Sequence, residues 1–272
     1  VGGKGINISL LLKNIGKESK ALGFVAGFTG DFIKEELTKQ GIKSNFIETE
    51  GFTRINIKLT TDTETEINSQ SSKVNRTNIL DFFSSLDELT SEDTVFLSGN
   101  IIPGMEDDDF VHIAKKVKEQ GANLVVDSNK DMVLHTLKYH PFIVKPNEFE
   151  LGEMFDVHLQ SLEDIAIYAK KLQEMGAQNV LVSRGSKGAI LFTHSGEIFS
   201  ANIAKGKVVS TIAAGDSMLA MFVAKYDETN DFPLSLQYAS AAGGATSFSA
   251  GVGKQELINE LLVQINVEKI SL

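Results

Sequence analysis

Short apolar runs alternate with amphipathic, helix-like stretches along most of this chain. The runs that predict strands are 21–25, 94–97, 124–127, 142–145 and 179–183, and helical periodicity marks 110–120 and 162–175 between them. This alternation predicts a largely parallel sheet with helices covering both faces. After residue 183, two predicted strands at 188–193 and 197–203 are joined by a turn at 194–196, which favours an antiparallel edge. The last third has a helical pattern, with an apolar stripe formed by Leu257, Ile258, Leu261, Leu262 and Ile265.

The composition limits the possible chemistry. The 272 residues are enough for one large α/β domain or two modest ones. The chain has no cysteine, which excludes disulfides and cysteine nucleophiles, and its scattered histidines form no helix-spaced zinc pair. A net charge of −10 argues against a nucleic-acid or anionic-membrane surface. With no membrane-length apolar run and no leader pattern, we expect a cytoplasmic protein.

The stretch from Ser210 to Met218 carries the strongest chemical signal. Small residues lead into Asp216 and a helical pattern follows at once, so several backbone N–H groups point at one spot beside a carboxylate. Such a spot stabilises anionic oxygens, and the carboxylate can accept a proton from an attacking hydroxyl. These are the parts that phosphoryl transfer to an alcohol needs. The alternative is structural, since aspartate is favoured near helix starts in any case.

Two further segments could hold phosphate or metal. Residues 2–7 combine glycines, which let a ligand approach the backbone, with the charge of Lys4 and the amide of Asn7. They match neither a P-loop nor a dinucleotide fingerprint, and a plain glycine turn is the alternative. Asn147 and Glu150 follow a strand and stand three residues apart, which suits either the hydration of a phosphate-bound metal or a simple capping box.

Arginine, which favours planar two-pronged contacts with anions, occurs only at positions 54, 76 and 184. Arg184 follows a strand, and Gly185 and Gly188 beside it allow a tight turn that either contacts a phosphate or is a plain hairpin turn. Small polar residues also follow the strand 94–97, at 98–100.

Residues 53–68 predict a hairpin outside the main alternation. Its two strands are joined by a turn at 61–64, and the first strand has one apolar face and one polar, partly cationic face. The polar face carries Arg54, Asn56 and Lys58, and the apolar face carries Ile55, Ile57 and Leu59. An ordinary amphipathic surface hairpin fits this pattern equally well.

These segments stand in an order that resembles the PfkB/ribokinase family of sugar kinases. The glycine pair with Asn7, the Asn147-x-x-Glu150 pair, Ser183-Arg184-Gly185 and the Ala-Gly-Asp-Ser of 214–217 all match, between residue 1 and about residue 253. Within the family, 53–58 and 65–68, supported by 21–24 and 27–30, look most like the bacterial 1-phosphofructokinase branch. Tagatose-6-phosphate kinases share the glycine start and the Thr-Arg pair but usually diverge after it.

The resemblance implies a ribokinase-like three-layer α/β/α sandwich with a mostly parallel central sheet and a small β lid. Residues 1–44 and 69–272 would form the α/β domain that binds nucleotide and substrate, and 45–68 would form the lid hairpin, which excludes water on closure. The family also has an earlier strand and an aspartate that contacts sugar hydroxyls, and without them we expect an incomplete sheet and poor sugar binding. A homodimer through the lid is implied, with no nucleic-acid or membrane partner.

The resemblance also implies ATP-dependent phosphorylation of fructose 1-phosphate at its 6-hydroxyl, to fructose 1,6-bisphosphate. Asp216 would be the general base, and the N–H groups of Ala213, Ala214 and Gly215 would hold the phosphoryl group. The implied substrate-binding residues are Gly2, Gly3, Lys4, Asn7, Arg54, Asn56, Lys58 and Ser98. The implied ATP-binding residues are Lys145, Asn147, Glu150, Ser183, Arg184, Gly185, Gly188 and Gly251, with Glu150 ordering Mg²⁺ through water.

One departure from the family lies inside the anion site, because Ala213 stands where glycine is usual. Its methyl group would crowd the anion pocket or restrict the backbone. The open alternatives are a tagatose-6-phosphate kinase or 6-phosphofructokinase of the same family, a non-catalytic sugar-phosphate or nucleotide binder, and a dinucleotide oxidoreductase. The last of these lacks its glycine fingerprint.

Overall fold

The computed structural model describes residues 1–60 and 64–272, with side chains described outside 58–66. The helices are α1 (Lys4–Asn14), α2 (Gly27–Lys39), α3 (Arg76–Ser84), α4 (Asp107–Glu119), α5 (Lys130–Thr136), α6 (Glu148–Met154), α7 (Leu162–Glu174), α8 (Ala214–Thr229), α9 (Phe232–Ser247) and α10 (Gln255–Leu262). The strands are β1 (Lys20–Ala26), β2 (Lys43–Thr49), β3 (Ile57–Thr60), β4 (Glu64–Ile67), β5 (Thr94–Gly99), β6 (Asn123–Ser128), β7 (Ile143–Val144), β8 (Asn179–Ser183), β9 (Ala189–Phe192), β10 (Ile198–Ala201) and β11 (Val267–Ile270).

The central sheet has the strand order β11-β10-β9-β8-β7-β6-β5 within the described residues. β5 to β8 pair in parallel, and β8 to β11 pair antiparallel. The predicted parallel sheet and its antiparallel edge are therefore confirmed. The prediction of a helical last third is wrong in one respect, because β11 adds an edge strand. Its two charged residues hide it from a search for apolar runs, since an edge strand need not be buried.

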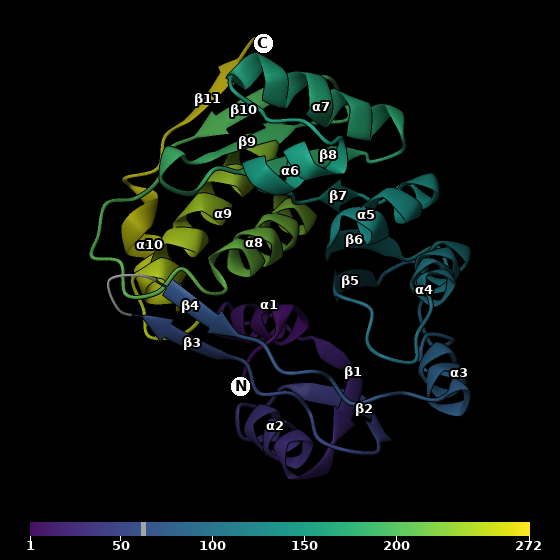
Figure 1. The fold of residues 1–272 in the computed structure, drawn as a ribbon. Helices are drawn as coiled ribbons and strands as arrows, with labels where there is room; N and C mark the ends of the chain where they lie inside the picture. Colours follow the sequence, from purple (N-terminus) through teal and green to yellow (C-terminus); the bar gives the residue numbers. More distant parts are fainter. Residues whose placement is uncertain (61–63) are drawn as a thin grey trace.

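Helices cover both faces of this sheet, which confirms the three-layer sandwich (Figure 1). Alternate residues of one strand point into opposite layers: Val180 and Val182 pack on the side of α3–α7, and Leu181 packs on the side of α1, α8, α9 and α10. The predicted C-terminal stripe packs in the second layer. None of the helices in the described part of the chain combines the length and apolar character that a bilayer crossing requires.

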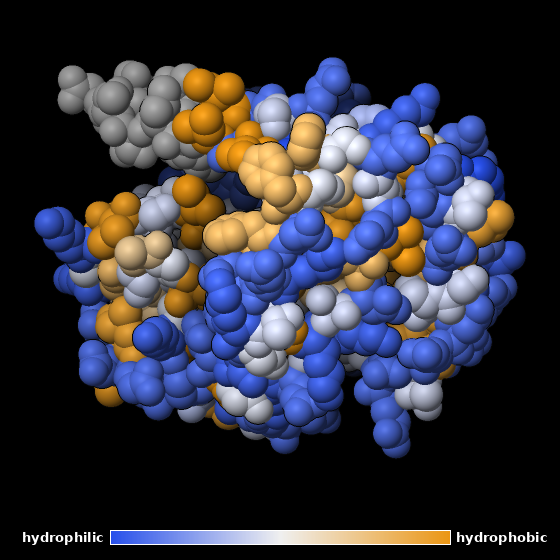
Figure 2. Space-filling model, turned by 90° about the horizontal axis from the view of Figure 1, so that it is seen from below, coloured by the Kyte–Doolittle hydropathy of each residue, from blue (hydrophilic) through white to orange (hydrophobic). Residues whose placement is uncertain are grey.

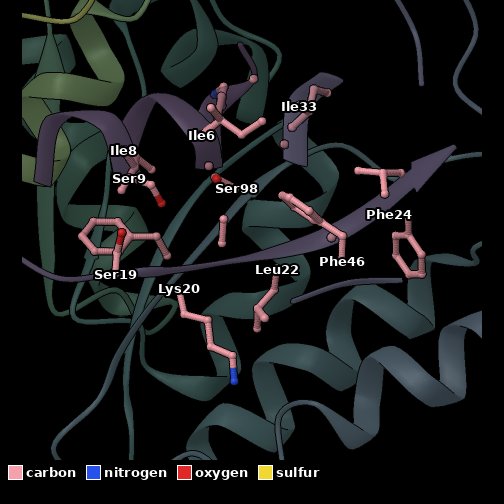
Figure 3. A pocket seen from close by; sticks show the side chains of 18 of the residues that line it. Ile6, Ile8, Ser9, Ser19, Lys20, Leu22, Phe24, Ile33, Phe46 and Ser98 are labelled. Carbon is pink, nitrogen blue, oxygen red and sulfur yellow. The ribbon is translucent and has the colours of Figure 1, made fainter. Parts of the chain in front are cut away.

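β1 and β2 form a second, two-stranded parallel sheet beside α1 (Figure 1). A cavity of about 1720 Å³ is lined by α1, β1 and β5, and Figure 3 shows Ile6, Leu22, Phe24 and Phe46 around it. Among the described strands β1 pairs only with β2, and β5 pairs only with β6, so an additional strand would meet unpaired backbone groups at the cavity. The earlier strand expected from the resemblance stays a prediction.

β3 and β4 form the predicted hairpin, antiparallel and outside the central sheet. The predicted start at 53 is too early: the strand begins at Ile57, because the Ser69 hydroxyl bonds both the N–H and the carbonyl of Ile55 in place of a strand partner. Residues 61–63 of the predicted turn lie outside the described residues, and the Lys58 side chain lies outside the described side chains. Residues 45–49 of the expected lid segment belong to β2 and pair with β1.

Candidate active site

Asp216 is the third residue of α8, and only 8% of it is exposed. The amide of Asn7, in α1, donates a hydrogen bond of 2.7 Å to its carboxylate. Burial raises the pKa of Asp216 above its usual range, the Asn7 hydrogen bond opposes the rise, and the charge of Asp127 adds to it. Ala213, not Asp216, is the N-cap residue of α8, so N-capping does not account for the aspartate. Its burial and raised proton affinity suit a group that accepts a proton from a hydroxyl.

The residues just before Asp216 form a tight entry into α8. Ala213 has φ 64° and ψ 0°, the left-handed region that strains any residue with a Cβ. The N–H of Ala214 lies 3.4 Å from the Thr211 carbonyl oxygen, a long contact, and the first N–H groups of a helix have no intrahelical acceptor. A Cβ placed on Gly215 would lie 3.0 Å from the ammonium of Lys145, so that cation sits directly beside the helix start.

Asp127, which sequence reasoning missed as a site residue, lies at the centre of this region. It is near the end of β6 and 3% exposed, and its carboxylate accepts a 2.7 Å hydrogen bond from the Lys4 ammonium. Burial disfavours the charged form of Lys4 and would lower its pKa. The negative charges of Asp127, Glu150 and Asp216 favour the charged form more strongly, so the pKa of Lys4 is raised. The available signal was an acidic residue directly after three apolar residues of a buried strand.

Asn147 and Glu150 cap α6 reciprocally, which confirms the capping box. The Asn147 side chain accepts from the Glu150 N–H and the Glu150 carboxylate accepts from the Asn147 N–H, both at 2.8 Å. The cap occupies one carboxylate oxygen of Glu150. In the described part of the chain there is no group of three or more His, Cys, Asp or Glu side chains that could together bind a metal ion. In proteins Mg²⁺ commonly keeps several water molecules and is held by one or two carboxylates together with the phosphates of the substrate. A lone carboxylate such as that of Glu150 fits this kind of site.

The predicted turn after β8 packs against the start of α6. Arg184 donates from its N–H to the Gly188 carbonyl at 2.8 Å, and a Cβ on Gly188 would lie 2.0 Å from the Ala201 carbonyl oxygen, so only glycine fits there. The Arg184 guanidinium donates to Glu148 at 2.7 Å. Burial opposes ionisation of Glu148, but the Arg184 and Lys187 cations prevail and lower its pKa. An isolated β-bridge joins Asn147 to Ser183, so the two predicted ATP-binding segments lie side by side.

Of the eight predicted substrate residues, Asn7 bonds Asp216, the Lys58 side chain lies outside the described side chains, and the other six line the cavity beside α1. It is lined by Gly2, Gly3, Lys4, Arg54, Asn56 and Ser98, and Ser98 is labelled in Figure 3. Seen from below, the molecule has apolar residues gathered around a hollow on this face (Figure 2). Gly251 is exposed in the loop before α10. That loop is tied to the helix start, because Thr246 accepts from the Gly253 N–H at 3.0 Å and donates to the Ser217 hydroxyl at 2.8 Å.

A family model described as pfkB family carbohydrate kinase matches residues 1–257. The chain belongs to the pfkB family of carbohydrate kinases. This pfkB kinase is 40% identical to the 1-phosphofructokinase of Bacillus subtilis (strain 168) over 269 residues, which cover 99% of this chain and 88% of the relative. It is 37% identical to the D-tagatose-1-phosphate kinase of Bacillus licheniformis over 266 residues, or 97% and 87% of the two chains.

The fold agrees with this assignment. The pfkB kinase superposes on the crystal structure of phosphofructokinase-2 from Escherichia coli with a TM-score of 0.91 at 22% sequence identity, covering 97% of this chain and 87% of the other. The predicted ribokinase-like fold and sugar-kinase class are therefore confirmed. The oxidoreductase alternative no longer fits.

Proposed function

We propose that this kinase transfers the γ-phosphoryl group of ATP to the 6-hydroxyl of fructose 1-phosphate and forms fructose 1,6-bisphosphate. The observation that carries the proposal is the buried Asp216 carboxylate, held by Asn7 at the start of α8 with the Lys145 cation beside it. The 40% identity to a 1-phosphofructokinase supports the choice of substrate.

Asp216 takes the proton of the 6-hydroxyl while the hydroxyl oxygen attacks the γ-phosphorus of ATP and the bond from that phosphorus to the bridging oxygen of ADP breaks. The N–H groups of Ala213, Ala214 and Gly215 stabilise the phosphoryl oxygens, and Lys145 adds a positive charge. Burial strengthens these interactions because the surroundings have a lower effective dielectric constant than water.

Lys4 and Arg54, with Asn56 and Lys58, bind the phosphate that the substrate already carries, and Gly2, Gly3, Asn7 and Ser98 contact the sugar. A chain of net charge −10 needs such a local group of cations to bind an anionic substrate. Lys4 comes from α1 and Arg54 from the approach to β3, and both line one cavity, which supports a shared ligand. Closure of the hairpin over this cavity excludes water.

Lys145, Ser183, Arg184, Gly185, Gly188 and Gly251 contact ATP, and Asn147 and Glu150 order Mg²⁺, Glu150 through water. Bound Mg²⁺ neutralises charge on the ATP phosphates. The Asn147–Ser183 bridge and the Glu148–Arg184 ion pair support this assignment, because they join the two segments.

D-Tagatose 1-phosphate is the second candidate substrate, since a relative named for it is 37% identical. Both sugars are ketohexose 1-phosphates with a free 6-hydroxyl, so the same base and phosphate site would serve either. The two sugars differ only in the configuration of the hydroxyl at C4, and a pocket discriminates poorly between such ligands unless it bonds that hydroxyl directly.

A coupled assay of ADP release tests the proposal with fructose 1-phosphate, tagatose 1-phosphate, fructose 6-phosphate and tagatose 6-phosphate. We expect the highest kcat/KM for fructose 1-phosphate, and both 6-phosphates well below the two 1-phosphates. A preference for tagatose 1-phosphate selects the second candidate, and a preference for a 6-phosphate moves the assignment to a sister kinase. Thermal stabilisation by sugar phosphate without any ADP release supports a non-catalytic binder.

We also propose a homodimer through the lid. Phe28, Phe52, Ile55, Ile57 and Ile67 are 70, 61, 60, 47 and 51% exposed and lie in or near the hairpin. A cluster of exposed apolar side chains is typical of an interaction surface. Sedimentation should give a dimer mass for the parent chain and a lower mass for Ile57→Glu; equal masses contradict the interface. The cytoplasmic location stays a prediction.

A further inference from the structure

Asp127 joins the two cationic positions of the site. One carboxylate oxygen bonds the Lys4 ammonium at 2.7 Å, and the other lies 3.7 Å from the Lys145 ammonium. The side chain of Asp127 is 2% exposed, that of Lys145 7% and that of Lys4 35%. Lys4 lines the cavity beside α1, where the sugar phosphate is proposed to bind, and Lys145 lies beside Gly215 at the helix start. The carboxylate therefore lies between the two parts of the site.

Fold stability alone does not explain this carboxylate. Its second oxygen is buried and accepts no hydrogen bond, and the Lys145 ammonium at 3.7 Å from it is beyond hydrogen-bond distance; buried polar atoms without a hydrogen-bond partner are rare in proteins. A buried ion pair is moreover often no more stable than well-packed apolar residues of the same volume. Asp109, the other buried aspartate bound to a cation, uses both of its oxygens, one for Arg76 and one for the N–H of Glu106.

We propose that Asp127 is a positioning residue of the kinase: it fixes the Lys4 and Lys145 ammonium groups and keeps their charge from weakening Asp216 as a base. This inference rests on the proposed function, in which Asp216 accepts the hydroxyl proton. In this role Asp127 contacts neither the reacting hydroxyl nor the transferred phosphoryl group.

The charges around Asp216 explain how Asp127 acts on the base. α1 contributes Lys4 and the neutral Asn7, β6 contributes Asp127, and the segment after β7 contributes Lys145. α9 packs against α8 but carries no aspartate, glutamate, lysine, arginine or histidine. The two lysines favour the ionised carboxylate of Asp216, and Asp127 opposes them and raises its pKa. Removing the Asp127 charge leaves the lysines unopposed, so Asp216 holds a proton less strongly and becomes a weaker base.

Asp127→Asn keeps the shape of the side chain and removes its charge. We expect kcat to fall on the order of 10- to 100-fold, since both the base and the positions of the cations are disturbed. We expect KM for the sugar phosphate not to rise, because the site loses a negative charge. The acid limb of the kcat–pH profile should move to lower pH. A purely structural role would lower the folded fraction and leave the limb in place.

Two variants serve as controls. Asp127→Glu keeps the charge, so the acid limb of the kcat–pH profile should stay near that of the parent. The longer side chain displaces the Lys4 and Lys145 ammonium groups, so kcat should still fall. Asp109→Asn removes a buried carboxylate that is 5% exposed and paired with Arg76 outside the site, so it should lower the melting temperature without moving the limb. If Asp127→Asn does not fold, Asp127→Glu still tests the positioning of the lysines.

The inference is overturned if Asp127→Asn leaves kcat within about twofold or leaves the acid limb in place, or if Asp127→Glu has the kcat of the parent. It is also overturned if Asp109→Asn moves the limb as far as Asp127→Asn does. Failure of the proposed function looks different, because Asp216→Asn would then retain turnover. A silent Asp127→Asn together with an inactive Asp216→Asn rejects only the role of Asp127.

Discussion

Around Asp216 the polar side chains are buried and held by hydrogen bonds or ion pairs, whereas around Arg54 the chain is exposed. Asn7, Asp127 and Asp216 are 9, 3 and 8% exposed and belong to α1, β6 and α8. On the approach to β3, by contrast, Phe52 and Ile55 are 61 and 60% exposed. The proposed base therefore belongs to closely packed elements. The proposed binding of the sugar phosphate depends instead on a segment with few buried contacts.

The buried and the exposed regions suit different steps of the proposed reaction. A base and an anion site must be held within fractions of an ångström, which packed helices and strands achieve. A segment that closes over a ligand must instead form new contacts when the ligand binds. In the free protein such a segment therefore has exposed side chains that are still without contacts. Substitutions in the buried region should accordingly act on kcat, and substitutions in the exposed segment should act on KM.

The largest effect is expected for Asp216→Asn. Removal of the general base should lower kcat about 10²- to 10⁴-fold, while binding of ATP, followed by thermal shift, persists. In the parent enzyme kcat should fall with decreasing pH as Asp216 takes up a proton. Because the pKa of Asp216 is raised, chiefly by burial, this acid limb should lie at higher pH than an exposed aspartate would give. Turnover at the parental rate would refute the role of Asp216.

Arg54→Ala tests the exposed side of the comparison. Loss of a charge-assisted contact to the substrate phosphate should raise KM for fructose 1-phosphate about 10- to 100-fold with a much smaller change in kcat. Arg76→Ala is the matched control, since Arg76 is another exposed arginine and pairs with Asp109 outside the site. A fall in kcat with KM unchanged would instead place Arg54 among the groups that act in the transition state.

The smallest effect is expected for Ala213→Gly. Glycine relieves the left-handed strain of this position, which stabilises the folded chain, but it also increases the conformational entropy of the unfolded chain, which opposes the gain. The net effect should be a free energy of unfolding raised by up to about 1 kcal/mol. Ala214→Gly, one residue on and inside α8, should lower it by a similar amount. Denaturant melts of the two variants measure both changes. Equal effects of the two substitutions would show that the conformation of Ala213 carries no strain.

Local spacing was enough to predict several parts of the site. Asn147 and Glu150, three residues apart after a strand, form the capping box that their spacing favours, because both partners lie within one helical turn. The Gly185–Gly188 turn follows from glycine conformations in the same way. The burial of Asp216 could not be predicted, since the Asn7 amide that holds it is 209 residues away.

The sequence by itself determined the layers, because apolar residues at strand and helix periods fix which faces must be buried, and the order of its motifs determined the family. Only the tertiary structure brought Lys4 to Asp127 across 123 residues and paired β1 with β2 in parallel. Periodicity records whether a side chain faces a core, and the packing of distant elements decides which side chain it meets there. The charges around the proposed base are for this reason a property of the fold.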